Sequence, residues 1–142
     1  MATQNNVSLR TMITAADLST KQFYCVKVDS AGLIALCAAA GEAVFGVLQD
    51  KPESGRAGAV AVGGAVKVIA GGNVAAGAKV KTDANGKAVT ATAATVNTAN
   101  TGAASDAVVG SYVFGTALVA GVSGDIITVE LTHEGLIPTT AA

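Results

Sequence analysis

The sequence predicts an all-β domain, a sandwich or a barrel of short antiparallel strands. Short runs rich in Val and Ile recur along the 142-residue chain and end at Gly, Asp, Asn or Ser. The 17 Gly residues supply the turns that such a fold needs. This spacing of strands and turns is typical of sandwiches and barrels. The length fits one domain.

Each strand is expected from its own apolar run, taken in chain order. The segment 14–22, which precedes the first strand, is the only one that fits a helical turn, because Thr14 can cap it and Asp17 follows three residues later. A loop fits this segment equally well. The expected strands are 23–28, 33–37, 43–49, 58–63, 65–70, 78–82, 87–92, 111–119 and 125–131.

Two connections share one turn pattern. "VDSAGLI" and "TDANGKA" each place Asp before a three-residue loop that ends in Gly, which is typical of a type I turn followed by a left-handed residue. In the first hairpin this turn pairs Val28 with Ile34 and Val26 with Leu36, which puts apolar side chains on one face. The second stretch, 80–89, is expected to be a hairpin tip. A calcium-binding EF-hand would need flanking helices and a distal Glu.

The hairpin register also places Cys25 opposite Cys37. Reduced thiols are favoured, because a cytoplasmic protein keeps its Cys reduced and a small buried Cys behaves as a hydrophobic residue. A disulfide stays open as the alternative. Two Cys are too few for a metal site, and the single His, His133, lies far along the chain in a C-terminal segment expected to be a tail. No metal is expected.

The chain divides into three parts. Residues 1–13 are expected to form an extended N-terminal arm, residues 14–135 the β domain, and residues 136–142 a C-terminal tail. Within the domain, the low-complexity run of Ala, Thr, Asn, Gly and Ser over 91–110 has no amphipathic stripe and is expected to be a long exposed loop. Small side chains dominate the apolar residues, so the core is thin and would gain from contacts with other subunits.

The charge pattern bears on partners and location. The formal net charge is −1 and the nine Lys and Arg are scattered, so a nucleic-acid partner is not expected. No run approaches the ~20 apolar residues that cross a bilayer, so no membrane association is expected. The polar N-terminus has no pattern of a secretion signal. These features favour a soluble protein made in the cytoplasm.

No pattern of residues predicts an enzyme or a cofactor. His133 is the only candidate His base, and no G-x-S-x-G motif surrounds a Ser. The glycine-rich stretch at 71–77 lacks the Lys-Ser/Thr ending of a P-loop. The ten acidic residues are scattered singly. Lys87, at the second hairpin, lacks the flanking residues of lipoyl or biotinyl carriers.

Four segments together resemble a family of small tailed-phage structural proteins, the capsid decoration or cement proteins. They are "FGVLQDKP" at 45–52, "VAVGGAVKVIAGG" at 60–72, "VKTDANGKAV" at 80–89 and "GTALVAG" at 115–121. The resemblance implies a β-barrel or β-tulip domain that binds the outside of the expanded capsid. It also implies a homotrimer, with the major capsid protein as partner and the virion surface as its location after assembly in the host cytoplasm. In this role the protein would stabilise the capsid.

Within that interpretation, the N-terminal arm is the candidate capsid-binding element. It begins polar, then becomes apolar before the first expected strand, so it could add as a strand to an edge of the capsid protein. We therefore expect an arm that is separable from the β domain. The candidate capsid-binding residues are Val7, Leu9, Arg10, Met12 and Ile13.

Two other functions fit less well. A head-fibre or tail-associated β domain would keep the protein in the virion, but a receptor-binding tip usually shows aromatic or charged patches, and only the stretch with Tyr112 and Phe114 could offer one. A small carrier or ligand-binding barrel would need a pocket with convergent polar groups, which the sequence does not indicate.

Overall fold

The computed structural model describes residues 5–92 and 110–138, and all regular structure in these ranges is β-strand. No helix in these ranges is long and apolar enough to cross a membrane. The strands are β1 (Asn5–Ile13), β2 (Cys25–Val28), β3 (Ile34–Leu36), β4 (Gly46–Leu48), β5 (Ala57–Ile69), β6 (Lys79–Thr82), β7 (Ala88–Thr90), β8 (Gly110–Ala117) and β9 (Ile126–Pro138).

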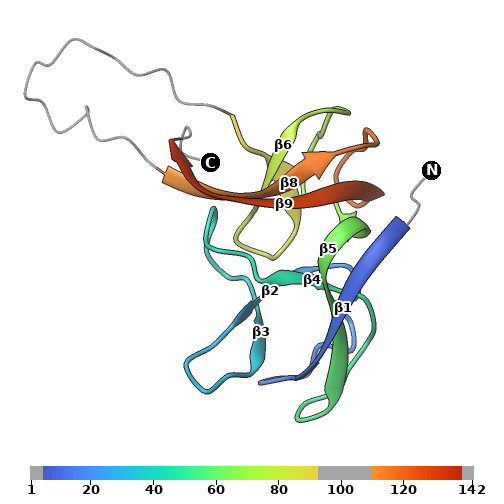
Figure 1. The fold of residues 1–142 in the computed structure, drawn as a ribbon, viewed down its shortest axis with the longest axis vertical. Coiled ribbons are helices and arrows are strands. Elements are labelled where there is room, and N and C mark those ends of the chain that lie inside the picture. Colours follow the sequence, from blue (N-terminus) through green and yellow to red (C-terminus); the bar gives the residue numbers. More distant parts are fainter. Residues whose placement is uncertain (1–4, 93–109, 139–142) are drawn as a thin grey trace, which may run out of the picture.

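The nine strands form one antiparallel sheet that curls into a barrel-like domain (Figure 1). The strand order is β3-β2-β4-β5-β9-β8-β6-β7, and β1 pairs with β5 outside this path. In Figure 1, β6, β8 and β9 lie in the upper part of the view and β1 to β4 in the lower part, with β5 linking the two. The prediction of a small all-β, barrel-like domain is confirmed.

Strand β5 links the two parts because it changes partners along its length. Its first half pairs with β1 on one edge and β4 on the other, and its second half pairs with β9. Gly63 and Gly64 lie at the change, and Gly64 has a φ of 88°, a conformation that glycine adopts without steric cost. The expected strands 58–63 and 65–70 are therefore a single strand, because the glycines let it continue.

The core consists of two apolar clusters on opposite faces of the central strands. Neighbouring residues of a strand point to opposite faces, so Cys25 joins the larger cluster whereas Val26 joins the smaller one. The same split divides Val47 from Leu48 on β4. Both faces of β4 and of the first half of β2 are therefore covered, whereas Lys27 is half-buried and Val28 is exposed. Phe114 is the largest fully buried side chain.

The first hairpin has the predicted register. Val28 pairs with Ile34 and Val26 pairs with Leu36. Gly32 ends the turn with a φ of 80°, as the turn type requires. The 80–89 stretch forms the second hairpin, with Thr82 paired to Ala88, and its turn has the same geometry.

The segment 14–22 forms no helical turn, so that alternative was wrong. Thr14 pairs with Ile34 in an isolated bridge, and its hydroxyl donates a hydrogen bond to the Glu53 carbonyl at 2.8 Å rather than capping the segment. Asp17 instead accepts a local bond from the Ser19 amide at 3.0 Å. Long-range contacts of Thr14 therefore outweigh the local capping pattern.

The ends of the domain differ from the expected boundaries. Residues 5–13 of the expected arm form β1, which pairs with β5 of the same chain. Residues 136–138 of the expected tail belong to β9, which continues past His133 and Gly135 through positive φ values of 46° and 81°. The expected strand ended at residue 131, but pairing with β8 carries β9 on to Pro138. Most of the expected loop at 91–110 lies outside the described residues.

Candidate interaction surface

The residues that often carry chemistry lie apart from one another. No three His, Cys, Asp or Glu side chains within 5–92 and 110–138 gather as a metal site. His133 Nε2 lies 2.9 Å from the carbonyl oxygen of Val62, across the sheet. At the second hairpin, Asp83 Oδ1 accepts bonds from the amides of Asn85 at 2.8 Å and Lys87 at 2.9 Å, so this carboxylate organises the turn.

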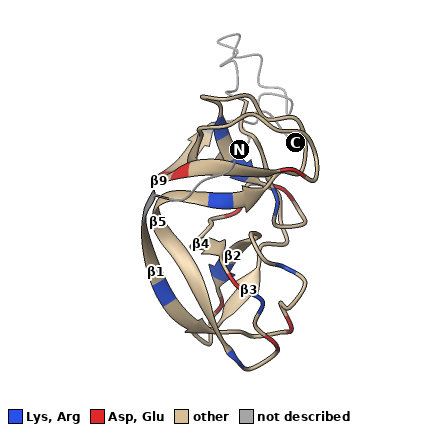
Figure 2. Ribbon diagram, turned by 90° about the vertical axis from the view of Figure 1, so that its right-hand side faces the viewer, with Lys and Arg blue, Asp and Glu red and all other residues tan. Residues whose placement is uncertain are grey.

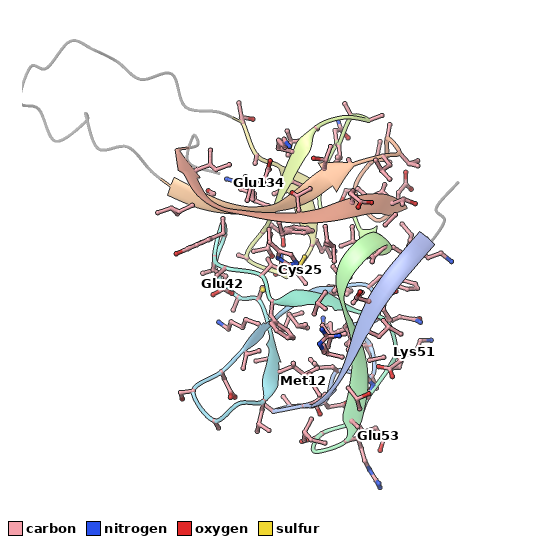
Figure 3. The ribbon with its side chains drawn as sticks, viewed as in Figure 1. Met12, Cys25, Glu42, Lys51, Glu53 and Glu134 are labelled. Carbon is pink, nitrogen blue, oxygen red and sulfur yellow. The ribbon has the colours of Figure 1, made fainter. Side chains whose placement is uncertain are left out.

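The two Cys are adjacent, buried and free. The Cys37 amide donates to the Cys25 carbonyl at 3.1 Å, which confirms that the two residues lie opposite each other. Burial raises the pKa of both thiols, that of Cys37 to about 12. A thiol of this kind is protonated at neutral pH and is a poor nucleophile. Figure 3 shows Cys25 near the middle of the molecule.

The candidate capsid-binding residues divide between the interior and the surface. Val7 packs against the larger apolar cluster. Met12, labelled in Figure 3, packs against the smaller one. Leu9 and Ile13 are 50% and 44% exposed, although both are apolar. Arg10 is exposed, and its guanidinium donates to the Leu9 carbonyl at 3.0 Å. β1 thus anchors itself with two side chains and presents the other three outward.

The outer edge of β1 has no strand beside it in the described part of the chain. β1 pairs only with β5. A free edge presents a row of unpaired backbone N–H and C=O groups, which can pair with a strand of another molecule. At nine residues, β1 is longer than β3 and β7, the strands that end the main path of the sheet and have three residues each. It is therefore the edge best suited to pairing with a second chain.

A shallow cleft of about 280 Å³ lies beside β1. Its lining combines apolar, amide and cationic side chains from β1, β5 and the segments next to β2 and β4. Gln22 Nε2 donates to the Gln49 carbonyl at 2.9 Å, and this bond joins two of the contributing segments. The lining residues are Val7, Leu9, Gln22, Phe23, Gln49 and Lys67.

Phe23, which lines the cleft, has a strained backbone conformation. Its φ is 69°, which is rare for a bulky residue. Its amide donates to the Leu48 carbonyl at 2.7 Å, and its carbonyl accepts from the Ile69 amide at 2.9 Å. These two bonds fix the residue between β4 and β5 and maintain the strain. Phe23 was expected to begin the strand 23–28, whereas β2 begins only at Cys25.

Lys67 supplies the positive charge of the cleft. The ion pairs within the described residues are Lys27 with Glu42 and Lys79 with Glu134, so Lys67 has no acidic partner there. Glu130 of β9 pairs with Ala65, two residues before Lys67 on β5, so it is a diagonal neighbour of Lys67 on the same face of the sheet, but the two form no ion pair. Figure 2 shows basic residues on both β1 and β5. The surface beside β1 therefore favours a negatively charged partner group.

Sequence reasoning identified only two residues of the cleft, Val7 and Leu9. The other lining residues come from separate segments that the curled sheet brings together. One signal was present, since Lys67 interrupts the apolar stretch "AVKVIA". Nothing in the sequence linked this Lys to Gln22, Phe23 or Gln49.

One solved structure has a fold similar to that of this chain. No protein-family model matches the sequence, and no curated protein matches it. The crystal structure of the head fiber gp8.5 N base of bacteriophage phi29 is similar, with a TM-score of 0.57 and 17% sequence identity. The match covers 96% of this chain and 99% of that chain.

Proposed function

We propose that this chain is a structural protein of a tailed-phage head, which binds the outer surface of the expanded capsid and stabilises it. The observation that carries the proposal is the fold similarity to the base of a phage head fiber, which extends over 96% of this chain. The resemblance of four sequence segments to capsid decoration proteins supports the same location.

The proposed role is mechanical. Packaged DNA presses on an expanded capsid from inside. A protein that bridges neighbouring capsid subunits adds interface area that must be separated before the shell opens. Such a role needs a rigid domain with an attachment surface. The curled sheet and the free edge of β1 fit both requirements.

We propose the exposed side of β1 as the attachment surface for the major capsid protein. Leu9 and Ile13, on one face of β1, expose apolar area that a partner would cover, and Arg10 is exposed on the opposite face of the strand. Backbone pairing along the edge would add directional bonds. The proposed homotrimer would place three such surfaces on the capsid, which raises the effective concentration of each for its site.

A base for a head fibre is the second candidate. The name of the similar structure favours it directly, since that protein is the base of a head fiber. A fibre base and a decoration protein would both bind the capsid. They differ in what they do there, because only a decoration protein is expected to hold the shell closed.

Co-sedimentation with expanded heads stripped of this protein tests the proposal, combined with the temperature at which the heads release DNA. Saturable binding with a raised release temperature is expected. Saturable binding with an unchanged release temperature would favour the fibre base. Absence of binding would overturn both virion functions. Analytical ultracentrifugation of the purified protein tests the homotrimer separately.

A further inference from the structure

We propose that the cleft beside β1 binds an acidic side chain of the protein partner, with Lys67 as its counter-charge. The inference rests on the proposed function for the identity of the partner, and it adds which kind of partner side chain the cleft binds. The cleft is lined by Val7, Leu9, Gln22, Phe23, Gln49 and Lys67.

The charge of the cleft selects the partner group. No acidic side chain lines the cleft, and Lys67 has no ion pair within the described residues. Lys67 is half-buried, and a Lys side chain in such a position packs its methylene stem on apolar surface while its ammonium stays at the water boundary. A carboxylate that enters the cleft would meet this cation beside apolar walls, and the bound segment would displace part of the screening solvent.

The apolar lining limits what can carry the carboxylate. Val7, Leu9 and Phe23 present hydrocarbon surface on the walls. The methylene groups of Glu, or an apolar residue next to Asp, would cover this surface. A free phosphate or a nucleic-acid backbone would leave it exposed. A protein segment with acidic and apolar residues fits better than an inorganic anion.

The position of the cleft also indicates an extended segment. Val7 and Leu9 belong to β1, whose outer edge is unpaired in the described part of the chain. A strand that lies along this edge brings its side chains close to those of β1 on the same face. Backbone pairing and carboxylate binding can therefore occur in one partner segment.

The cleft is also held rigid before binding. Phe23 keeps its strained conformation through backbone bonds to Leu48 and Ile69, and Gln22 is bonded to Gln49. A site whose lining is already ordered loses little conformational entropy when a ligand enters. The strain at Phe23 is consistent with a fixed position for the ring.

Charge reversal in the cleft tests the inference in the head-binding assay. Lys67→Glu is expected to weaken binding to stripped heads by tenfold or more, and Lys67→Met by a few-fold. Lys51→Glu, an equal charge change at an exposed residue outside the cleft, is the matched control and should bind as the wild type does. Added salt should weaken the wild type more than Lys67→Met. Equal melting temperatures would show that the variants are folded.

A peptide titration tests the cleft without the heads. The probe is an acetylated hexapeptide of alternating valine and glutamate, and its control replaces glutamate with lysine. The acidic peptide should shift the amide NMR signals of Val7, Phe23 and Lys67 in the wild type and not in Lys67→Glu. The lysine peptide should leave these signals unchanged.

These two assays separate the possible failures. If the wild type does not bind heads but the acidic peptide shifts the cleft signals, the proposed function fails and the cleft chemistry stands. If heads bind Lys67→Glu as tightly as the wild type, or the peptide shifts nothing, the inference is overturned. It is also overturned if Lys67→Glu changes the oligomeric state of the free protein, because a second copy then occupies the cleft.

Discussion

Gly86 lies against Leu36, so the tip of the second hairpin packs on the first. A Cβ atom added at Gly86 would lie 2.7 Å from Leu36 Cδ1 and 3.2 Å from the Cys25 carbonyl oxygen. The Cys25 amide also donates to the Gly86 carbonyl at 2.7 Å. The two turns have the same sequence pattern. The Gly of the second turn packs against another hairpin, whereas nothing lies within 4 Å of a Cβ added at Gly32.

Gly86→Ala is expected to destabilise the domain by about 2–4 kcal/mol, because left-handed strain adds to the clash with Leu36. Gly32→Ala is the matched control. Gly32 has nearly the same φ, but nothing lies within 4 Å of its added Cβ, so it should cost only about 1–2 kcal/mol. Urea unfolding measures both values. Equal losses would contradict the packing of the hairpin tip.

Strand β1 is expected to contribute to stability as well as to binding. Met12→Ala should lower the free energy of unfolding by about 1–2 kcal/mol, since Met12 is only partly buried against the smaller cluster. Thr11→Ala, at an exposed position of the same strand, should change it by less than about 0.5 kcal/mol. Chemical denaturation tests the pair.

Deletion of residues 2–13 should therefore destabilise the domain more than Met12→Ala does. The deletion removes β1 and leaves one edge of β5 without its partner. A truncated protein with the wild-type melting temperature would show that β1 is a separable arm after all. Loss of head binding by the deletion alone cannot test the attachment surface, so single substitutions on the exposed side are required.

Phe23 provides a test of backbone strain. Phe23→Gly removes the ring and also the strain of the positive φ, whereas Phe23→Ala removes the ring and keeps the strain. The glycine variant should therefore be more stable than the alanine variant by about 1–2 kcal/mol. Thermal melting compares the two variants. Equal stability would mean that the backbone at Phe23 relaxes when the ring is lost.

The buried thiols predict a loss of stability at high pH. Burial raises the pKa of Cys25 and that of Cys37, the latter from 9.0 to about 12. The unfolded thiols lose protons first, so stability is unaffected below pH 9 and falls between there and about pH 12. Urea unfolding across this range measures the slope. The double variant Cys25→Ala, Cys37→Ala should show a smaller slope than the wild type.

Glu42 predicts the opposite dependence at low pH. Burial pushes its pKa up, but bonds from the Ala38 and Ala39 amides and from Lys27 outweigh this and leave the pKa below 4.5. Its contribution is present above pH 4.5 and is lost as the pH falls through the lower value in the folded state. Glu42→Gln should cost about 1 kcal/mol at pH 7 and much less at pH 3. A pH-independent difference would contradict this assignment.

The local features of the fold were predictable because neighbouring residues decide them. Alternation of apolar residues located most strands, and the Asp and Gly of each turn set the hairpin register that pairs Val28 with Ile34. Errors arose where distant contacts outweighed local signals. Thr14 bonds to Glu53 instead of capping a helix, and Gly64 lets β5 continue instead of ending it.

The candidate site shows the same division. The sequence by itself determined that apolar residues recur over 7–13, because this property depends only on the order of residues in the segment. Only the tertiary structure decided that β1 pairs with β5, that Leu9 stays exposed while Met12 is partly buried, and that Lys67 and Phe23 lie in the same cleft. The physical reason is that pairing between distant strands and the curl of the sheet depend on long-range packing, which no local pattern of residues specifies.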